Sequence, residues 1–336
     1  MSLILAFESS CDDTSVAIIN SDYEVLCNLV STQKDHAAFG GVLPELASRL
    51  HLKNILYLTE TALKDTGLSP NEISALAVSI NPGLIGSLII GLSFAKSLAW
   101  SWGKPFVTVN HMLAHIFANF IEHPDINTPF LALVVSGGHT ELVHFHDLTS
   151  FEVVGKTLDD AAGETFDKTA KLLGMGFPGG PAIDRAAAKG DPEFAGFPRA
   201  LNRKGNYNFS YSGMKTAVLE YLAKQDQAFI DEHQDDLAAS VQQAIIDPLI
   251  NKSLAYAKKE NIKTILLGGG VAANSALRAQ LRQKTQTLGL EFHVPSLRYC
   301  VDNAAMVGAA AIPKYLTRQF SGLDVNAFST KGTRSI

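Results

Sequence analysis

Two passages of the chain place apolar runs and small polar connections in the same order. Leu3–Phe7 is followed by a short loop of carboxylate, hydroxyl and thiol side chains and then by Ser15–Asn20. Phe130–Val135 is followed by Ser136–Thr140, which contains two glycines, and then by Glu141–His146. Such residues are typical of tight turns between strands. The pattern therefore predicts two β-hairpins.

Each predicted hairpin is followed later in the chain by a strand, a glycine-containing turn and a helix. Ala75–Ile80 precedes a proline–glycine turn and a helix over about Ser87–Trp102, and Thr264–Leu267 precedes three glycines and a helix that begins near Asn274. The repetition predicts a duplicated α/β fold. Ligands of such folds bind beyond the carboxyl ends of the strands, so the glycine turns are candidate binding positions.

Composition narrows the class of protein. The 336 residues are 46% hydrophobic and 18% charged, with a formal net charge of −5, which excludes general disorder and fits two domains or one two-lobed unit. With 28 Lys and Arg against 33 Asp and Glu, a nucleic acid would have to meet a local basic patch or a partner chain. The best basic cluster is Arg199, Arg203 and Lys204, to which Lys331 and Arg334 of the C-terminal tail can add.

Cysteines and apolar runs indicate a cytosolic protein. The three cysteines are far apart and form no CxxC pair, so neither a disulfide framework nor a cysteine zinc site is expected. Met1–Glu8 lacks the basic leader of a signal peptide. Leu84–Ala95 is the longest apolar stretch and is too short to span a bilayer. We therefore expect no membrane association.

One pair of histidines has the spacing of metal ligands. His111 and His115 lie one helical turn apart and can bind one ion. No glutamate lies between them, which excludes HExxH protease chemistry, and an ordinary core or surface pair is the alternative. A carboxylate from elsewhere would complete a two-histidine, one-carboxylate set that suits iron or zinc. His144 and His146 share a strand face, where an ordinary exposed strand is expected.

Two glycine-rich segments allow more than one interpretation. The glycines of Gly268–Gly270 predict the close approach of a ligand or of another backbone segment, or simply a tight turn. Asn274 either caps the next helix or contacts a ligand base. Gly174–Gly179 matches GxGxxG but follows the predicted helix Thr165–Leu173, so Gly174 is predicted to end that helix.

Nine short segments, spread in order over most of the chain, together resemble one protein family. The segments are Glu8–Thr14, Phe39–Arg49, Asn110–His115, Val135–Thr140, Ala162–Lys168, Phe177–Pro181, Phe209–Thr216, Gly268–Asn274 and Cys300–Asn303. They resemble the TsaD family, the tRNA threonylcarbamoyladenosine transferases once labelled O-sialoglycoprotein endopeptidases. The resemblance implies an α/β fold of the duplicated actin/hexokinase-like (ASKHA) type, two-lobed with a central cleft. It also implies an N-terminal lobe over residues 1–128 with about 310–320 returning to it, a C-terminal lobe over 129–309, and a loosely ordered tail over 321–336.

The resemblance implies transfer of a threonylcarbamoyl group from threonylcarbamoyl-adenylate to the exocyclic amine of an adenosine. This adenosine lies 3′ of the anticodon in tRNAs that read codons beginning with A. The family's metal ligands fall on His111, His115 and Asp302, with Fe²⁺ favoured and Zn²⁺ the second choice. Because Asp302 lies far along the chain from His115, we expect a cleft between the lobes to bring them together.

The resemblance also assigns the donor-binding residues by motif. The acyl-phosphate end of the donor falls to Val134, Val135, Ser136, Gly137 and Gly138, the ribose hydroxyls to Asp167 and Asp184, and the adenosine to Gly180 and Asn274. Asp13 is a candidate general base because of its place in the first loop. The implied partners are tRNA, a TsaB heterodimer partner bound through the N-terminal lobe, and the TsaE ATPase.

Two other function classes fit the same fold. One is an ATP-dependent kinase or carbamoyltransferase, and the other is a non-catalytic nucleotide-binding scaffold of a tRNA-modification complex. The histidine pair with Asp302 favours the transferase over both, since sugar kinases of this fold bind magnesium through carboxylates. The chain departs from the family pattern at Asp13, where glutamate is frequent, at Leu113, where an acidic residue is frequent, and at Asn81, where glycine is frequent.

Overall fold

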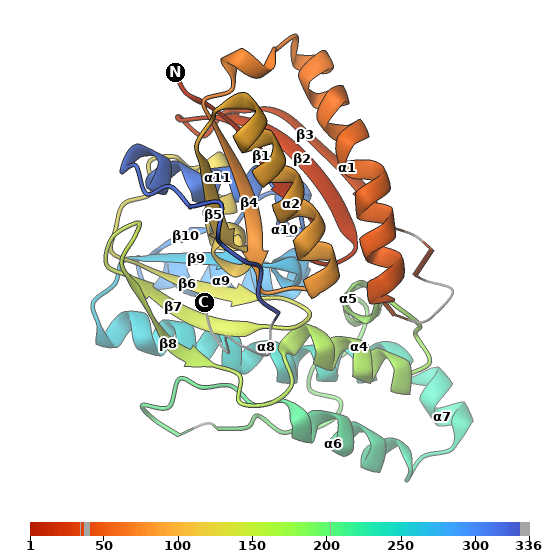
Figure 1. Ribbon diagram of the computed structural model, residues 1–336. Coiled ribbons are helices and arrows are strands. Elements are labelled where there is room, and N and C mark those ends of the chain that lie inside the picture. Colours follow the sequence, from red (N-terminus) through yellow and green to blue (C-terminus); the bar gives the residue numbers. More distant parts are fainter. Residues whose placement is uncertain (34, 37–40, 202, 330–336) are drawn as a thin grey trace. The chain divides into compact units, whose positions relative to one another are not determined.

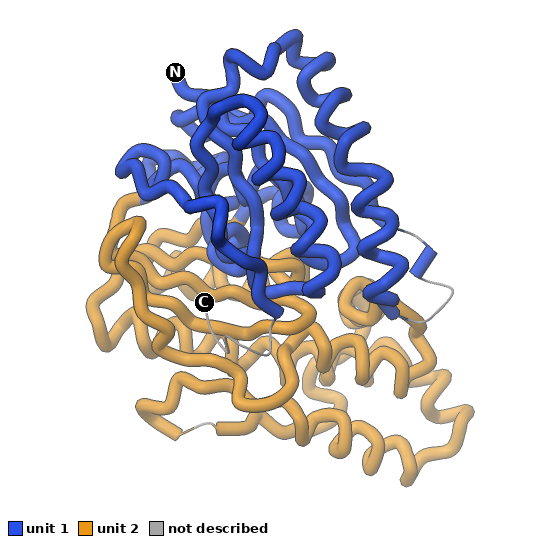
Figure 2. The backbone as a smooth tube through the Cα atoms, in the orientation of Figure 1, with its two compact units in different colours: residues 1–126, 295–336 blue, residues 127–294 orange. Residues whose placement is uncertain are grey.

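The computed structural model describes residues 1–33, 35–36, 41–201 and 203–329. The chain divides into two compact units, shown in Figure 2. Unit 1 comprises Met1–Ile126 and Pro295–Ile336, and unit 2 comprises Asn127–Val294. The return to the first unit therefore begins at Pro295 rather than near residue 310, and residues 295–309 belong to unit 1 instead of the C-terminal lobe.

The sheet of unit 1 has the order β3-β2-β1-β4-β5 (Figure 1). Its strands are β1 (Leu3–Glu8), β2 (Asp13–Asn20), β3 (Val25–Thr32), β4 (Ala75–Asn81) and β5 (Phe106–Asn110). β1 pairs antiparallel with β2 and parallel with β4. The central strands are buried on both faces, which explains their nearly continuous apolar sequences.

Helices cover both faces of this sheet. They are α1 (Pro44–Thr66), α2 (Ile85–Trp102), α3 (His111–Phe117), α10 (Leu297–Cys300) and α11 (Ala304–Leu316), with the short 3₁₀ helices η2 (Pro70–Glu72) and η3 (Ala118–Ile121). α1 and α2 pack on the face that carries Leu5 and Phe7. α11 packs on the opposite face, where a Cβ at Gly308 would lie 2.4 Å from Ile19 Cγ2 and 3.3 Å from Ala6 Cβ. This close approach fixes the returning C-terminal segment in unit 1.

The sheet of unit 2 repeats this arrangement in the order β10-β9-β6-β7-β8. Its strands are β6 (Phe130–Val135), β7 (Thr140–Phe145), β8 (Phe151–Lys156), β9 (Thr264–Gly268) and β10 (Glu291–His293). β6 pairs antiparallel with β7 and parallel with β9, as β1 does with β2 and β4. The predicted hairpins and the duplicated α/β fold are therefore confirmed.

Unit 2 has six α-helices among its described residues, and a glycine ends the first of them. They are α4 (Ala162–Leu172), α5 (Gly179–Ala187), α6 (Ser212–Leu222), α7 (Gln227–Glu232), α8 (Gln234–Lys259) and α9 (Ser275–Thr287), with the 3₁₀ helix η4 (Gly270–Ala273). Gly174 follows α4 with φ of +72° and donates its N–H to the carbonyl of Lys171. It ends that helix as predicted and belongs to no dinucleotide-binding loop.

The C-terminal segment is better ordered than the sequence predicts. The N–H of Ser321 donates to the carbonyl of Phe106 at 2.9 Å, and the N–H of Phe328 donates to that of Ile80 at 3.1 Å. Val325 and Ala327 pack against the core of unit 1, which supplies the apolar burial that a loose tail would lack. Residues 330–336, including Lys331 and Arg334, lie outside the described residues.

One described helix is long and apolar enough by length and composition to cross a membrane, namely α2. Its Leu88, Leu92 and Ala95 are buried inside unit 1. The apolar sequence of α2 is thus that of a core helix.

Candidate functional site

Both histidines of the predicted pair lie on α3 in unit 1. β5 ends at Asn110, whose Oδ1 accepts hydrogen bonds from the N–H groups of Met112 at 2.8 Å and Leu113 at 3.1 Å. This cap begins the helix at His111 and places His115 one turn later on the same face. The two rings are 4.7 Å apart between centroids, and both residues are buried.

Asp302 completes this pair within the same unit. It lies between α10 and α11, and its Oδ1 is 3.4 Å from Nε2 of His111 and 3.2 Å from Nε2 of His115. The expectation that a cleft between the lobes brings these residues together is wrong, because residues 295–336 return to unit 1. The cap of α11 is Asn303, whose Oδ1 accepts from the N–H of Met306 at 3.1 Å. Asp302 therefore does not serve as that cap.

A fourth residue, Glu8, positions His111 and was missed from the sequence. Its carboxylate is fully buried at the end of β1, and its Oε2 lies 2.9 Å from Nδ1 of His111. The hydroxyl of Ser10 lies 3.2 Å from the same nitrogen. The signal that could have found Glu8 is an acidic residue ending an entirely apolar strand, because a buried carboxylate needs a partner.

The donor set fits a divalent cation. Because the carboxylate of Glu8 can only accept a hydrogen bond, Nδ1 of His111 carries the proton and Nε2 of the neutral ring carries a lone pair. This lone pair faces the carboxylate of Asp302, and the two repel each other. A proton or a cation between them removes the repulsion. Burial opposes charging of His111, but the carboxylates of Glu8 and Asp302 outweigh it and raise the pKa of His111 well above its usual value. The pKa of Asp302 is lowered correspondingly. The same negative field favours a metal ion, and two imidazoles with one carboxylate suit Fe²⁺ or Zn²⁺.

Asp13 is a buried carboxyl of unit 1. It begins β2, and its Oδ1 is buried without a hydrogen-bond partner among the described residues. Burial raises the pKa of Asp13 to about 6, and the charges of Asp302, Asp12 and Glu8 act in the same direction. A carboxyl of this kind accepts a proton near neutral pH.

In unit 2, the predicted phosphate-binding turn joins β6 to β7. The N–H of Ser136 donates to the carbonyl of His139 at 2.8 Å. Gly137 and Gly138, which follow Val134 and Val135 of the strand, are exposed, and a Cβ at either glycine would meet no atom within 4 Å. The backbone of this turn is therefore accessible to a ligand.

Two other glycines hold the same turn in place. A Cβ at Gly163, at the start of α4, would lie 2.5 Å from the carbonyl oxygen of Ser136. Gly269 has φ of +91°, and its Cβ would lie 2.3 Å from the carbonyl oxygen of Val135. Of the interpretations of the triple glycine, the close approach of another backbone segment is confirmed.

The predicted donor-binding carboxylates lie at helix N-termini of unit 2. Oδ1 of Asp167 accepts from the N–H of Gly179 at 2.8 Å, and the N–H of Gly180 bonds the same carboxylate. Burial raises the pKa of Asp167 despite these bonds. Asp184 accepts from the N–H and the hydroxyl of Ser275, the hydroxyl at 2.8 Å. These carboxylates thus bind the first turns of α5 and α9.

Asn274 is the cap of α9. Its Oδ1 accepts from the N–H of Leu277 at 2.9 Å, and its Nδ2 donates to Oε1 of Gln242 at 2.6 Å. The capping interpretation is confirmed. Ser275 and Gln242, which engage Asp184 and Asn274, were not identified from the sequence because their contacts join distant parts of the chain.

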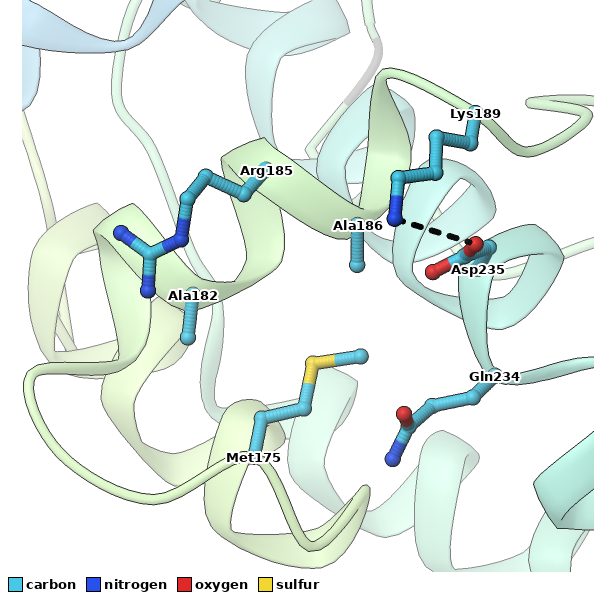
Figure 3. A pocket seen from close by; sticks show the side chains of 7 residues that line it. All are labelled: Met175, Ala182, Arg185, Ala186, Lys189, Gln234 and Asp235. Atoms are coloured by element: carbon cyan, nitrogen blue, oxygen red, sulfur yellow. Dashed lines mark ion pairs between the residues drawn. The ribbon is translucent and has the colours of Figure 1, made fainter.

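The described part of unit 2 also has an open pocket of about 550 Å³ (Figure 3). Its lining residues are Met175, Ala182, Arg185, Ala186, Lys189, Gln234 and Asp235. Figure 3 shows Lys189 pointing toward Asp235, with 4.0 Å between the charged atoms. No predicted donor-binding residue lines this pocket, so we assign it no part in donor binding.

Comparison with known proteins identifies the family. The profile described as "TsaD: tRNA N6-adenosine threonylcarbamoyltransferase" matches residues 24–309. The tRNA N6-adenosine threonylcarbamoyltransferase of Kosmotoga olearia is 48% identical over 325 residues, covering 96% of this chain and 97% of its own. That of Caldicellulosiruptor saccharolyticus is 46% identical over 326 residues, covering 97% and 96%.

Solved structures agree on the fold. Full-length HypF matches with a TM-score of 0.63 at 16% identity, covering 94% of this chain and 46% of its own. The (R)-2-hydroxyglutaryl-CoA dehydratase component A of Acidaminococcus fermentans matches with a TM-score of 0.54 at 13% identity, covering 94% and 100%. The ASKHA fold is thus shared by proteins with different names. The relatives from Kosmotoga olearia, Caldicellulosiruptor saccharolyticus and Chlorobium phaeobacteroides, at 46–48% identity, are each described as a tRNA N6-adenosine threonylcarbamoyltransferase. This chain belongs to the TsaD family of tRNA N6-adenosine threonylcarbamoyltransferases.

Proposed function

We propose that unit 1 binds one divalent metal ion, Fe²⁺ in preference to Zn²⁺, through His111, His115 and Asp302. The observation that carries this proposal is that Nε2 of both histidines lies within 3.4 Å of the same Asp302 oxygen. Glu8 meanwhile holds the opposite nitrogen of His111. When bound, the ion supplies Lewis-acid polarisation of an oxygen of the threonylcarbamoyl donor.

The exposed turn of unit 2 is proposed to bind the acyl-phosphate end of threonylcarbamoyl-adenylate. Its glycines present backbone N–H groups, which are suited to anionic phosphate oxygens. The mixed anhydride already contains a good leaving group, whereas the adenine amine is a weak nucleophile. The residues Val134, Val135, Ser136, Gly137 and Gly138 therefore contribute by positioning the donor and stabilising the charge that develops on the phosphate.

The adenosine part of the donor is proposed to bind at the N-termini of α5 and α9. Asp167 and Asp184 each accept helix N–H groups, and a carboxylate has further lone pairs for ribose hydroxyls. Asn274 uses one lone pair and one N–H inside the protein, which leaves one of each for the adenine edge. Gly180 has open space where a side chain would stand.

Asp13 is proposed to accept the proton that the tRNA amine loses on acylation. Its unpartnered Oδ1 and its raised pKa support this role. A base with a pKa near the working pH combines a useful ionised fraction with a useful proton affinity.

We propose that partner chains supply much of the positive protein surface that binds the tRNA substrate. Arg199 of the basic cluster is engaged by Asp247 at 3.0 Å, so its charge is compensated. Arg203 and Lys204 are exposed. With a net charge of −5 overall, these two side chains offer few of the phosphate contacts that nucleic-acid binding usually requires.

The TsaB partner is proposed to dock on α1 and α2 of unit 1. α1 exposes Leu52, Leu56 and Tyr57, and α2 exposes Ile85 and Ile89. The two helices meet near these residues, because a Cβ at Gly86 would lie 2.4 Å from Oγ of Ser48. Exposed apolar and aromatic patches of this kind mark protein interfaces. TsaE would join the assembly as its ATPase, in the cytoplasm.

The test is reconstitution of tRNA modification together with measurement of the bound metal. The purified chain is mixed with TsaB, TsaE, the donor-forming components and unmodified tRNA, and the nucleosides are analysed by mass spectrometry. Asp302→Ala should lose bound metal and threonylcarbamoyladenosine formation while remaining folded. Asn303→Ala is the matched control, because it removes the cap of the same helix and leaves the metal ligands in place.

The two outcomes separate the proposal from a purely structural role. If Asp302→Ala keeps full metal content and full transfer activity, the proposed metal site is wrong. If Asn303→Ala loses metal as completely as Asp302→Ala, the loss reflects disruption of α11 rather than of a ligand.

A further inference from the structure

We propose that unit 2 has a second divalent metal site, for Zn²⁺, formed by His144, His146 and Glu152 on the hairpin of β7 and β8. These residues lie in the other unit from His111, His115 and Asp302. The site does not depend on the proposed function of unit 1. The sequence predicts only an ordinary exposed strand here. It indicates that the two histidines share a strand face, but it does not indicate that Glu152 lies beside them.

The strand pairing brings the three side chains together. His144 and His146 are two residues apart, their ring centroids are 4.3 Å apart, and Glu152 pairs with His144 across the β7–β8 register. Oε1 of Glu152 lies 3.8 Å from Nδ1 of His144 and 3.5 Å from Nε2 of His146. One ligand atom from each residue lies within 4.8 Å of the others.

These separations match ligands that share one ion. Zinc binds imidazole nitrogen and carboxylate oxygen at about 2.0–2.2 Å, so two ligands at the tetrahedral angle stand about 3.3–3.6 Å apart. The two nitrogen–oxygen distances lie at and slightly beyond this range, and beyond the usual length of a direct hydrogen bond. A small side-chain adjustment is sufficient to close the set around Zn²⁺.

The backbone that carries these ligands is held by its own turn. The N–H of His146 donates to the carbonyl of Ser150 at 2.9 Å. Oδ1 of Asp147 accepts from the N–H groups of Thr149 at 2.7 Å and Ser150 at 2.8 Å. Ligands on paired strands closed by a bonded turn lose little freedom when they bind an ion.

The surroundings keep the site accessible and suitable for a cation. The side chains of His146 and Glu152 are 50% and 57% exposed, so an ion can reach them from solvent. The hydroxyl of Tyr256 on α8, 3.3 Å from Nδ1 of His144, is a further polar neighbour. The carboxylate of Glu260 adds negative charge nearby, although Lys259 pairs with it.

A bound ion would join β8, the edge strand of this sheet, to β7 through side chains. Metal binding to the folded state alone stabilises that state by mass action. We therefore expect Zn²⁺ to raise the melting temperature of the protein through this site.

The experiment isolates the second site by removing the first. The full-length chain carrying His111→Ala and His115→Ala is stripped with a chelator and titrated with ZnCl₂ in a calorimeter. It should still bind a Zn²⁺ ion. Adding His146→Ala and Glu152→Gln should weaken this binding by at least about 10–100-fold, because losing even an outer-sphere partner of a metal ligand typically costs that much affinity.

A matched control uses His233, whose Nδ1 lies 3.2 Å from Oδ2 of Asp236. Among the described residues, His233 belongs to no group of three candidate metal ligands. His233→Ala in the same background should leave the Zn²⁺ affinity unchanged. Thermal melting of each stripped variant checks folding, and because His146 and Glu152 are half exposed their substitution should preserve the fold.

The proposal is overturned if the His111→Ala, His115→Ala chain binds no Zn²⁺, or if it binds equally well after His146→Ala and Glu152→Gln. It is also overturned if His233→Ala lowers the affinity as much as the change at the proposed ligands, since uptake would then be spread over surface histidines.

Discussion

Glu8 offers the sharpest test of how the proposed metal ligands are held. Glu8→Gln keeps the size of a fully buried side chain and removes its charge. In the native chain, Oε2 of Glu8 bonds Nδ1 of His111 at 2.9 Å, and Oε1 accepts from the N–H of Ser10 at 2.5 Å. An amide has only one acceptor oxygen, so one of these two donors must face an NH₂ group.

The expected effect is a loss of metal affinity without loss of the ligands themselves. Carboxylates that bond the far nitrogen of a metal-bound histidine contribute about 10–100-fold to affinity, which corresponds to about 1.4–2.8 kcal/mol. Glu8→Gln should therefore bind Fe²⁺ or Zn²⁺ about 10–100-fold more weakly, measured by competition with a chelator of known affinity. Glu8 acts here through His111, as a positioning residue.

Ser10→Ala is the matched control. It removes a hydroxyl 3.2 Å from the same nitrogen of His111 but leaves the carboxylate of Glu8. We expect a smaller effect, because a neutral hydrogen-bond partner contributes less than a charged one. Equal metal affinity of Glu8→Gln and the native chain, with both folded, would refute the role given to Glu8.

Three other substitutions test separate parts of the structure. Asn274→Ala should cost about 0.5–2 kcal/mol of stability by removing the cap of α9. It should also weaken adenine-nucleotide binding, measured by calorimetry, while the metal content stays unchanged. Unaltered nucleotide affinity would show that Asn274 is a helix cap only. Gly269→Ala should destabilise unit 2 by about 1–3 kcal/mol, because its φ is +91° and its Cβ would meet the carbonyl of Val135, whereas Gly270→Ala, with open space at that position, should change the melting temperature little. Burial opposes ionisation of Asp159, but hydrogen bonds from Ser210, Tyr211 and Ser212 outweigh it and lower the pKa of this carboxyl. The stabilising effect of Asp159 is therefore present above its unfolded-state pKa and is lost as the pH falls through its folded-state pKa. Asp159→Asn should accordingly reduce the loss of stability between neutral and acidic pH, and thermal melts with an unchanged acid limb would contradict this.

The sequence predicts local structure well in this chain and distant contacts poorly. The hairpins and the strand–turn–helix units follow from apolar runs of strand and helix length separated by turn residues, and all of them are present. The metal-ligand spacing of His111 and His115 is also a local property of one helix. Asp302 entered only through the family resemblance, because no periodicity relates it to α3.

The contacts that the sequence misplaced or left open depend on tertiary packing. The path by which Asp302 reaches the histidines depends on α11 packing against β1 and β2, where Gly308 permits close approach. The triple glycine serves the packing of Gly269 on Val135, which turn propensity alone does not distinguish from ligand binding. The segment after Phe320 has little apolar sequence, yet Val325 and Ala327 are sufficient to hold it on unit 1.

The division of unit 1 into two stretches of sequence has a consequence for synthesis. Domains tend to fold as units while the chain emerges from the ribosome. Unit 2 is continuous, so all of its residues are available before Pro295 has been added. Unit 1, in contrast, lacks α11 and Asp302 until the last part of the chain has emerged. Its proposed metal-ligand set is therefore completed late, and a nascent chain stopped before residue 302 holds both histidines without the carboxylate that lies beside them.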